Sequence, residues 1–426
     1  MYAYTHDAQT GGLLLNDSTP LFSKEPRPVY YRELDILGFD THFNYTKQDE
    51  LPYMWAEANC YWYRGRMVAK TKGGTLYTAP ELEFVLDADG NRVLPDGETL
   101  QPVDVAAMVE KNRELLEVIE QVTIKKIFDV YKRYRKKLDC FNVAFSGGKD
   151  SIVLLDLVKK ALPKSGFVVV FGDTGMEFPD TYDVIDKVEE QCRAEGIEFY
   201  RAASHFKPEE SWRLFGPPSR VLRWCCSVHK STPRTLKLRE ILGKNDYVGL
   251  DFVGVRAEES VARSEYDYES YGTKQKGQYS HNSILDWTSA EIWLYIYAHR
   301  LLINEAYKLG NSRVGCAFCP MSSKTDYLKN QTYKPEINKF VDIVREHYDE
   351  EDIANGYWCA RTNGSHLHTN EEKCREYFEN GNFVIEVTHP NTEWRKWAIT
   401  LGELPFKFSF EEKDNGYIVL FDERIL

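Results

Sequence analysis

Between residues 141 and 299, short apolar runs alternate with helical patterns, and this alternation constrains the fold more than any other feature. Runs such as 141–145 and 167–171 are too short for helices and are bounded by turn signals, so they read as buried strands. Helical patterns such as 149–162 and 179–195 lie between them. Short buried strands joined by helices form a parallel sheet that is covered on both faces. We therefore expect an α/β domain here.

The rest of the chain has a different pattern. Residues 1–102 contain short alternating segments separated by glycine turns, which predicts a strand-rich region. Apolar positions at three- and four-residue steps predict one long connecting helix within 103–138. The α/β domain then occupies 139–305. Residues 306–345 carry a Cys-x-x-Cys motif. The chain from about 306 to 426 starts helical and ends in strand-like runs, and we predict a C-terminal α+β region over 346–426.

Composition excludes several classes of protein. The formal net charge is −12, so the whole molecule is not a polycation built for nucleic acid, although a local basic patch is compatible with this value. Aromatic residues make up 14% of the chain, which argues against disorder. No apolar run approaches the roughly 18 residues that cross a bilayer. The first residues lack the basic and apolar regions of a secretory signal. We expect a cytoplasmic protein without a membrane partner.

A glycine-rich loop joins the first strand of the α/β domain to its first helix. The loop reads Ser146-Gly147-Gly148-Lys149-Asp150-Ser151. The glycines allow a tight turn and a close approach of the backbone, and the start of the helix offers free N–H groups and a positive dipole end. Lys149 adds a charge and the serines add hydroxyl donors. The spacings of the Walker A and dinucleotide-binding motifs are absent. The loop therefore predicts a phosphate or pyrophosphate site.

Residues 140–320 resemble the ATP-pyrophosphatase and phosphoadenosine phosphosulfate (PAPS) reductase family, whose glycine-rich loop is the PP-loop. Further matches follow in the family's order: Asp173-Thr174-Gly175, Arg223-Trp224-Cys225-Cys226 with Lys230, Gly254-Val255-Arg256 with Arg263, and Leu285-Asp286-Trp287. The resemblance implies an adenine nucleotide alpha hydrolase-like (HUP-type) fold, a parallel sheet with helices on both faces. It also implies that residues 146–151 and 173–175 bind ATP or a sulfonucleotide.

Four of the nine cysteines form a pattern. They are the adjacent pair Cys225 and Cys226 and the Cys-x-x-Cys motif of Cys316 and Cys319. An odd number of cysteines in a long chain without a signal peptide does not favour disulfides. The resemblance implies a [4Fe–4S] cluster on these four thiolates, with Zn²⁺ as the alternative. We also expect nearby cations to lower the pKa of these thiols. The cations in question are Lys230, Arg223 and Arg313.

The intact loop separates two activities within the family. Members that cleave ATP between its α- and β-phosphates keep the glycine loop, whereas sulfite-forming reductases degrade it and carry a cysteine-bearing C-terminal tail, which residues 417–426 do not match. The resemblance therefore favours an ATP pyrophosphatase that adenylates an acceptor for sulfur transfer, of thiolation or phosphorothioation type. One alternative is a PAPS or APS reductase. Another is a non-catalytic nucleotide-binding subunit of a defence or modification complex.

In the favoured mechanism an acceptor oxygen attacks the α-phosphorus, and the cluster holds or relays the sulfur that later displaces AMP. We expect Mg²⁺ near Asp150 or Asp173 to bridge the phosphates. Positive side chains stabilise the charge that develops on pyrophosphate. The candidate catalytic residues are Lys149, Asp150, Lys230, Arg256 and Arg263. The expected partners are an adenine nucleotide, a sulfur-donor protein such as a cysteine desulfurase, and a nucleic-acid acceptor.

The end of the long helix is the candidate surface for nucleic acid. Basic residues run from Lys125 to Lys137, and Tyr131 and Tyr134 between them are of a type that stacks on bases. A charged helix face that simply meets water is the commoner explanation for such a run.

Overall fold

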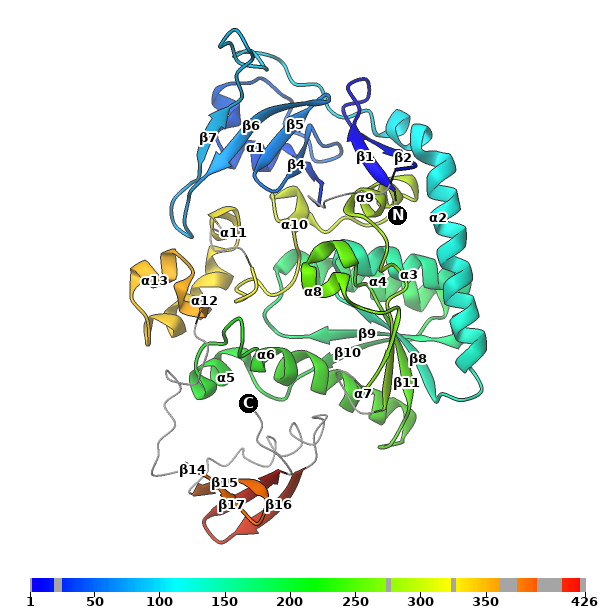
Figure 1. Cartoon of the computed structure of the whole chain (residues 1–426), viewed down its shortest axis with the longest axis vertical. Coiled ribbons are helices and arrows are strands. Elements are labelled where there is room, and N and C mark those ends of the chain that lie inside the picture. Colours follow the sequence, from blue (N-terminus) through cyan, green and yellow to red (C-terminus); the bar gives the residue numbers. More distant parts are fainter. Residues whose placement is uncertain are drawn as a thin grey trace.

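The computed structural model describes residues 2–18, 25–272, 277–322, 327–360, 374–388 and 408–421. Within these ranges the strands form four sheets, of two, five, six and four strands (Figure 1). The smallest is the hairpin of β1 (Ala3–His6) and β2 (Leu13–Asn16), which packs on the long helix α2 (Val105–Tyr134). None of the described helices combines the length and the apolar character needed to cross a membrane.

The central sheet has the order β10-β9-β8-β11-β13-β12. Its strands are β8 (Cys140–Phe145), β9 (Val168–Asp173), β10 (Phe199–Ala203), β11 (Gly249–Val253), β12 (Glu269–Tyr271) and β13 (Gln278–His281). All neighbours are parallel except β12, which lies antiparallel to β13 at the edge. The strand order reverses between β8 and β11. In an open α/β sheet, ligands bind at the carboxyl ends of the strands at such a reversal.

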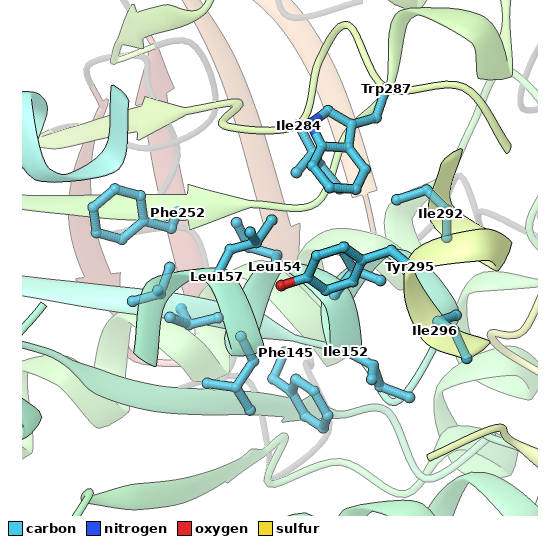
Figure 2. Close-up of a cluster of buried hydrophobic side chains, with 14 of the residues drawn as sticks. Phe145, Ile152, Leu154, Leu157, Phe252, Ile284, Trp287, Ile292, Tyr295 and Ile296 are labelled. Atoms are coloured by element: carbon cyan, nitrogen blue, oxygen red, sulfur yellow. The ribbon is translucent and has the colours of Figure 1, made fainter. Parts of the chain in front are cut away.

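Helices cover both faces of this sheet, as the alternation of strands and helices predicts. Val169 and Phe171 pack into a large core with α2, α3 (Lys149–Ala161), α4 (Pro179–Glu195) and α9 (Ser289–Ala298). Figure 2 shows part of this core, where α3 packs against α9. Val170, which lies between these two residues in β9, packs instead with Leu238 of α7 (Thr232–Leu242). Since successive strand residues point to opposite faces, the two cores confirm an α/β sheet covered on both sides.

Apart from the β1–β2 hairpin, the described strands of the N-terminal region form one five-stranded antiparallel sheet with its own core. Its elements are β3 (Arg27–Val29), α1 (Tyr31–Ile36), β4 (Met54–Glu57), β5 (Cys60–Tyr63), β6 (Arg66–Lys72) and β7 (Glu81–Phe84). A tyrosine pair joins this region to the α/β part, because the hydroxyls of Tyr30 and Tyr297 lie 2.8 Å apart.

The C-terminal part begins helical and ends in strands, as predicted. Its helices are α10 (Glu305–Lys308), α11 (Tyr327–Thr332), α12 (Lys334–Arg345) and α13 (Glu350–Ala354). Its strands are β14 (Cys374–Glu379), β15 (Asn382–Thr388), β16 (Phe408–Lys413) and β17 (Gly416–Phe421), which pair antiparallel. The segment boundaries proposed from the sequence at 102, 138, 305 and 345 stay a prediction.

Candidate nucleotide and cysteine site

The glycine-rich loop lies where the sequence predicts it, between the end of β8 and the start of α3. Gly147 has a φ of +72°, and a Cβ on this residue would lie 3.0 Å from Thr181 Cγ2. A side chain here would therefore be both strained and crowded. Asn304 Nδ2 donates to the Gly147 carbonyl at 3.3 Å and to Thr181 Oγ1 at 3.1 Å, which fixes the turn against α4.

The side chains of the two loop serines are hydrogen-bonded to each other. Ser146 Oγ donates to Ser151 Oγ at 3.2 Å, and Ser151 Oγ donates to the Gly148 carbonyl at 2.9 Å. No side chain caps the start of α3, although the Lys149 N–H donates to Tyr307 Oη at 3.0 Å. Backbone N–H groups at an uncapped helix start are anion-binding groups, so the loop keeps the geometry that a phosphate site needs.

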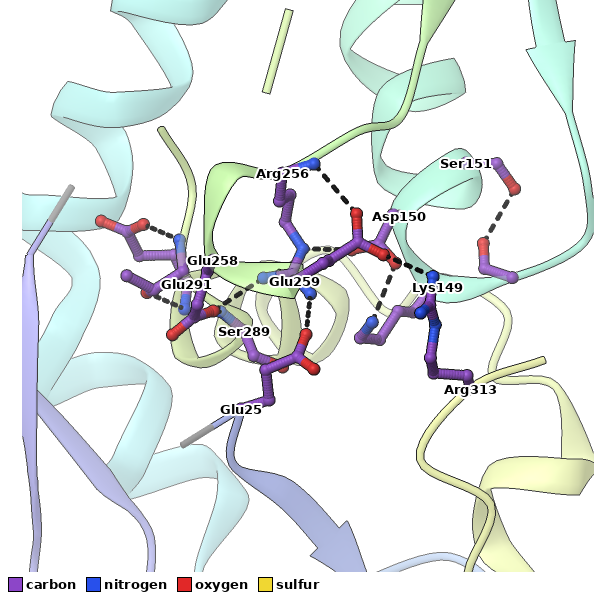
Figure 3. Close-up of polar contacts among 12 residues, drawn as sticks. Glu25, Lys149, Asp150, Ser151, Arg256, Glu258, Glu259, Ser289, Glu291 and Arg313 are labelled. Atoms are coloured by element: carbon purple, nitrogen blue, oxygen red, sulfur yellow. Dashed lines mark hydrogen bonds and ion pairs between the residues drawn. The ribbon is translucent and has the colours of Figure 1, made fainter. Parts of the chain in front are cut away.

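The candidate cations around the loop are engaged with carboxylates (Figure 3). Lys149 Nζ lies 2.8 Å from Asp150, and Arg256 Nε donates to the same carboxylate at 2.6 Å. The Arg256 side chain is fully buried and also contacts Glu258 at 2.7 Å and Glu25 at 2.8 Å. Burial alone would raise the pKa of Asp150, but the charges of Arg256 and Lys149 hold it well below its usual value.

Glu259 is the carboxylate partner of the remaining arginines of this region. Arg263 pairs with its carboxylate, Arg313 donates to it at 3.0 Å, and the Arg256 backbone N–H donates to it at 3.1 Å. Three of the predicted cations, Lys149, Arg256 and Arg263, thus already have carboxylate partners. Phosphates that dock on the loop would compete with these carboxylates.

The segment after β9 forms a second part of the site. Asp173 Oδ1 accepts hydrogen bonds from the Gly175 N–H at 2.9 Å and from Tyr182 Oη at 2.8 Å. Thr174 Oγ1 lies 3.6 Å from the thiol of Cys316. The segment therefore connects the carboxyl end of the sheet with the Cys-x-x-Cys motif.

The structure brings the four predicted ligand cysteines together. Cys225 and Cys226 lie in the short helix α6 (Trp224–Cys226), and Cys316 pairs through its backbone with Glu177. No disulfide joins these four thiols to one another. A hydrogen bond with Cys226, burial, and the nearby charges of Cys316 and Cys319 all raise the pKa of Cys225, which shows that the four thiols share one neighbourhood.

The four cysteines are of the residue type that an iron–sulfur cluster takes. A [4Fe–4S] cluster takes four cysteine thiolates, and these four thiols would be its ligands. Among the residues that the structure describes, no three His, Cys, Asp or Glu side chains converge on a position for a single metal ion.

The expectation that nearby cations lower the thiol pKa values is wrong. Lys230 acts in that direction on Cys316, but burial and the charges of Glu177 and Cys319 outweigh it and raise the pKa. Burial also raises the pKa of Cys319. Arg313, one of the expected cations, pairs with Glu259 instead.

Lys230 lies in the π-helical turn η3 (Ser227–Ser231), against β9. A Cβ on Gly172 would lie 3.4 Å from Lys230 Cγ. The predicted site residues therefore fall into two neighbouring groups at the carboxyl end of the sheet, one around the glycine loop and one around the cysteines. A single segment joins them, because the Val314 carbonyl lies 3.9 Å from the position of a Cβ on Gly148.

Sequence reasoning missed Glu177. The residue is 8% exposed, Thr174 Oγ1 donates to its Oε1 at 3.0 Å, and its buried Oε2 has no hydrogen-bond partner among the described residues. Burial raises its pKa. The available signal was an acidic residue between Met176 and Phe178, two apolar residues of the segment after the second strand.

The basic end of α2 lies away from both groups. The helix ends just before the amino end of β8, whereas the glycine loop follows the carboxyl end of that strand. Tyr131 packs against Phe141 with ring centres 4.9 Å apart, and Tyr134 packs against Tyr279 at 5.2 Å. These rings are therefore occupied within the fold, and the helix end is not placed beside the loop.

Comparison with known proteins supports the sequence resemblance. The phosphoadenosine phosphosulfate reductase domain matches residues 141–322. The adenosine 5'-phosphosulfate reductase of Geobacillus thermodenitrificans is 32% identical over 189 residues, which are 44% of this chain and 75% of that protein. An uncharacterized protein of Methanocaldococcus jannaschii is 32% identical over 255 residues, and the chain spans 59% of its length. A second uncharacterized protein of that organism is also 32% identical, and this chain spans 50% of its length.

Solved structures overlap with the chain only in part. The PAPS reductase of Candida auris, solved as a phosphate complex, is 19% identical with a TM-score of 0.34, covering 48% of this chain and 94% of that one. The U34-tRNA thiolase NcsA of Methanococcus maripaludis, solved with its [4Fe–4S] cluster, is 17% identical with a TM-score of 0.33. The match covers 59% of this chain and 88% of that one. Likenesses of this size are too slight to support a conclusion about this chain.

Proposed function

The chain belongs to the phosphoadenosine phosphosulfate reductase family, and we propose that it cleaves ATP between the α- and β-phosphates to adenylate an acceptor for sulfur transfer. The observation that carries this proposal is the intact loop of residues 146–151. Its Gly147 adopts a conformation that favours glycine, and Gly148 provides no side-chain cap at the helix start behind it, where the Lys149 N–H donates to Tyr307 Oη. Such a loop suits a pyrophosphate leaving group, whose charge the N–H groups and dipole of α3 stabilise.

The cations of the site would supply the rest of the positive charge that stabilises pyrophosphate. To do so, Lys149 would exchange its carboxylate partner for the phosphates. Lys149 and Arg256 are held near the loop by Asp150, so they are positioned before the nucleotide arrives. Phosphates at the helix start would draw Lys149 away from Asp150, while Arg256 would keep the carboxylates of Glu258 and Glu25. Electrostatic stabilisation of this kind depends on positioned groups rather than on an acid–base pair. Lys230 and Arg263 would contribute from the two sides of the site.

Mg²⁺ would neutralise charge on the phosphates. Asp150 and Asp173 are the two candidate carboxylates. Without nucleotide both oxygens of Asp150 are engaged, Oδ1 by Arg256 and Oδ2 by Lys149, and Oδ2 would become available once Lys149 turns to the phosphates. The hydrogen bonds of Asp173 to Gly175 and Tyr182 both fall on Oδ1.

In the proposed reaction the acceptor oxygen forms a bond to the α-phosphorus, and pyrophosphate leaves with the electrons of the broken bond. A sulfur nucleophile then replaces AMP. Cys225, Cys226, Cys316 and Cys319 would hold a [4Fe–4S] cluster, which when bound supplies a site for sulfur; Zn²⁺ is the alternative at these thiols. A sulfur-donor protein and a nucleic-acid acceptor remain proposed partners.

A sulfonucleotide reductase is the second candidate function. It is favoured by the 32% identity to an adenosine 5'-phosphosulfate reductase, and by the thiol of Cys316, which lies 3.6 Å from Thr174 Oγ1 in the segment after β9.

Two assays on one anaerobic preparation separate the candidates. The protein is incubated with Mg·ATP and, separately, with adenosine 5'-phosphosulfate and a thiol reductant. We expect pyrophosphate release from ATP and no sulfite from the sulfonucleotide. Sulfite release without ATP turnover would establish the reductase instead.

A further inference from the structure

The outer face of α2 carries large apolar side chains that meet solvent. The helix runs along one margin of the molecule in Figure 1, and its inner side packs on the main core. On the outer side lie Val118, Val122 and Phe128, whose exposed fractions are 51%, 49% and 46%. Apolar side chains gathered on one exposed face mark a contact with another molecule. α2 lies outside residues 141–322, the part of the chain that matches the family.

The outer face also has the spacing of a coiled-coil seam. In such a seam the contact positions recur at alternating steps of three and four residues, because these steps keep them on one side of the helix. Six exposed residues of α2 follow this rule and form what we call the α2 stripe: Glu114, Val118, Gln121, Lys125, Phe128 and Lys132. The steps are four, three, four, three and four, so they are the same in both directions. Two copies of the stripe can therefore meet antiparallel in register.

The α2 stripe is complementary to itself in this orientation. Against a second copy that runs the other way, Glu114 meets Lys132 and Val118 meets Phe128. Gln121 meets Lys125 near the centre, where the amide oxygen can accept a hydrogen bond from the ammonium group. In the parallel orientation each charge would instead face its own kind. An interface in which one patch serves both chains has a two-fold axis.

The charges at the two ends of the α2 stripe are not used within the chain. Among the described residues, neither Glu114 nor Lys132 has an ion-pair partner, whereas Lys125 pairs with Asp129 in the same helix. Exposed ion pairs contribute little free energy, so these charges would mainly set the orientation of the two helices. Burial of Val118 and Phe128 would supply the affinity.

We propose that the protein forms a homodimer through α2, with the α2 stripes of two chains packed antiparallel about a two-fold axis. The dimer also gives a role to the basic end of α2, which lies away from the nucleotide loop and the cysteines. Its Lys132 faces the acidic end of the stripe on the second copy. The inference does not depend on the proposed function, because α2 carries none of the candidate site residues.

Sedimentation velocity on the full chain tests the apolar part of the interface. A concentration series up to roughly 100 µM covers the weak association that a small interface gives, and we expect the wild type to dimerise within it. V118D places a carboxylate against Phe128 of the second copy, so the dissociation constant should rise at least about tenfold. L86D is the matched control, because Leu86 is 58% exposed but lies outside α2. It should dimerise like the wild type.

Charge reversal tests the orientation of the two helices. K132E places two carboxylates opposite each other at both ends of the seam, and the dissociation constant should again rise at least about tenfold. The double variant E114K/K132E restores unlike charges, so its dissociation constant should return to within about threefold of the wild-type value. All substituted positions are exposed, and melting temperatures confirm that the variants fold.

A wild-type protein that stays monomeric over the whole series would overturn the inference. So would a dimer that V118D leaves unchanged, or a double variant that dimerises no better than K132E. A single-stranded oligonucleotide that binds the monomeric wild type, and binds K132E more weakly, would assign the α2 stripe to nucleic acid instead.

Discussion

Arg256 Nε donates to Asp150 Oδ1 at 2.6 Å, so the segment after β11 is bonded to the loop after β8. These two strands are the neighbours between which the strand order reverses. The pair therefore lies across the crevice where α/β sheets bind ligands. Its arginine is fully buried and also holds Glu25, from the N-terminal region, and Glu258. The side chain of Arg256 therefore bonds the loop beside the crevice to the N-terminal region.

Replacing this arginine should destabilise the protein strongly. R256M leaves Asp150, Glu25 and Glu258 without their common partner, and breaking a buried ion pair from one side costs about 3–5 kcal/mol. Denaturant unfolding measures the loss. The control is R201M, since Arg201 pairs with two carboxylates on the surface, where such pairs contribute about 1 kcal/mol or less. Equal losses in the two variants would contradict the account.

The conformation of Gly147 predicts a selective loss of nucleotide binding. G147A forces a side chain into a positive φ and towards Thr181, and the loop would have to move. Binding of an ATP analogue, measured by calorimetry, should weaken at least about tenfold, which is about 1.4 kcal/mol. G196A is the matched control, because Gly196 has a φ of +75° at the end of α4 with open space around it. That variant should lose stability yet bind the nucleotide normally.

The cysteine neighbourhood predicts which thiols hold iron. C316S removes one of four ligands, so protein purified without oxygen should lose most of its iron and its visible absorption. C192S is the control, because Cys192 is buried in α4 within the main core. Full iron content in C316S would refute the ligand assignment. If the wild-type protein is colourless and carries zinc, the four thiols remain the ligands, but the metal that they bind is Zn²⁺ and not an iron–sulfur cluster.

Two buried histidines predict acid sensitivity above pH 4. Burial lowers the pKa of His281, and likewise of His229, from about 6.5 to about 4. The unfolded chain takes up these protons below pH 6.5 while the folded chain does not, so stability is complete above pH 6.5 and falls towards pH 4. Each pKa difference corresponds to about 3 kcal/mol at most. In H281Q the free energy of unfolding, measured with denaturant, should fall roughly half as much between pH 6.5 and pH 4. A pH profile identical to that of the wild type would contradict the lowered pKa of His281.

Local signals predict much of the fold because they act over few residues. Pro179 at the first turn and Gly196 with its left-handed φ bound α4 as the sequence indicates. The apolar runs 141–145 and 167–171 likewise predict β8 and β9 to within a few residues. The pairing of β12 with β13 was not predicted, because short polar strands such as Glu269–Tyr271 acquire their structure from the neighbouring strand.

The motifs locate the candidate site residues along the chain but not their contacts, and their roles stay a prediction. Residues 146–151 and the four cysteines lie where the motifs indicate. Arg256 was expected to face an anionic substrate, yet it is bound by Glu25, which lies 231 residues earlier in the chain. Glu177 became visible only through its burial beside Cys316. Ion pairs between distant residues depend on how elements pack, and a single sequence carries no direct signal for them.

A crystal structure of the protein with α,β-methylene-ATP tests the central claim most directly. We predict that the β- and γ-phosphates accept hydrogen bonds from the backbone N–H groups of Gly147 and Gly148, with the Lys149 side chain turned from Asp150 to the phosphates. A nucleotide bound with its phosphates elsewhere on the molecule, and with the loop unchanged, would contradict the account.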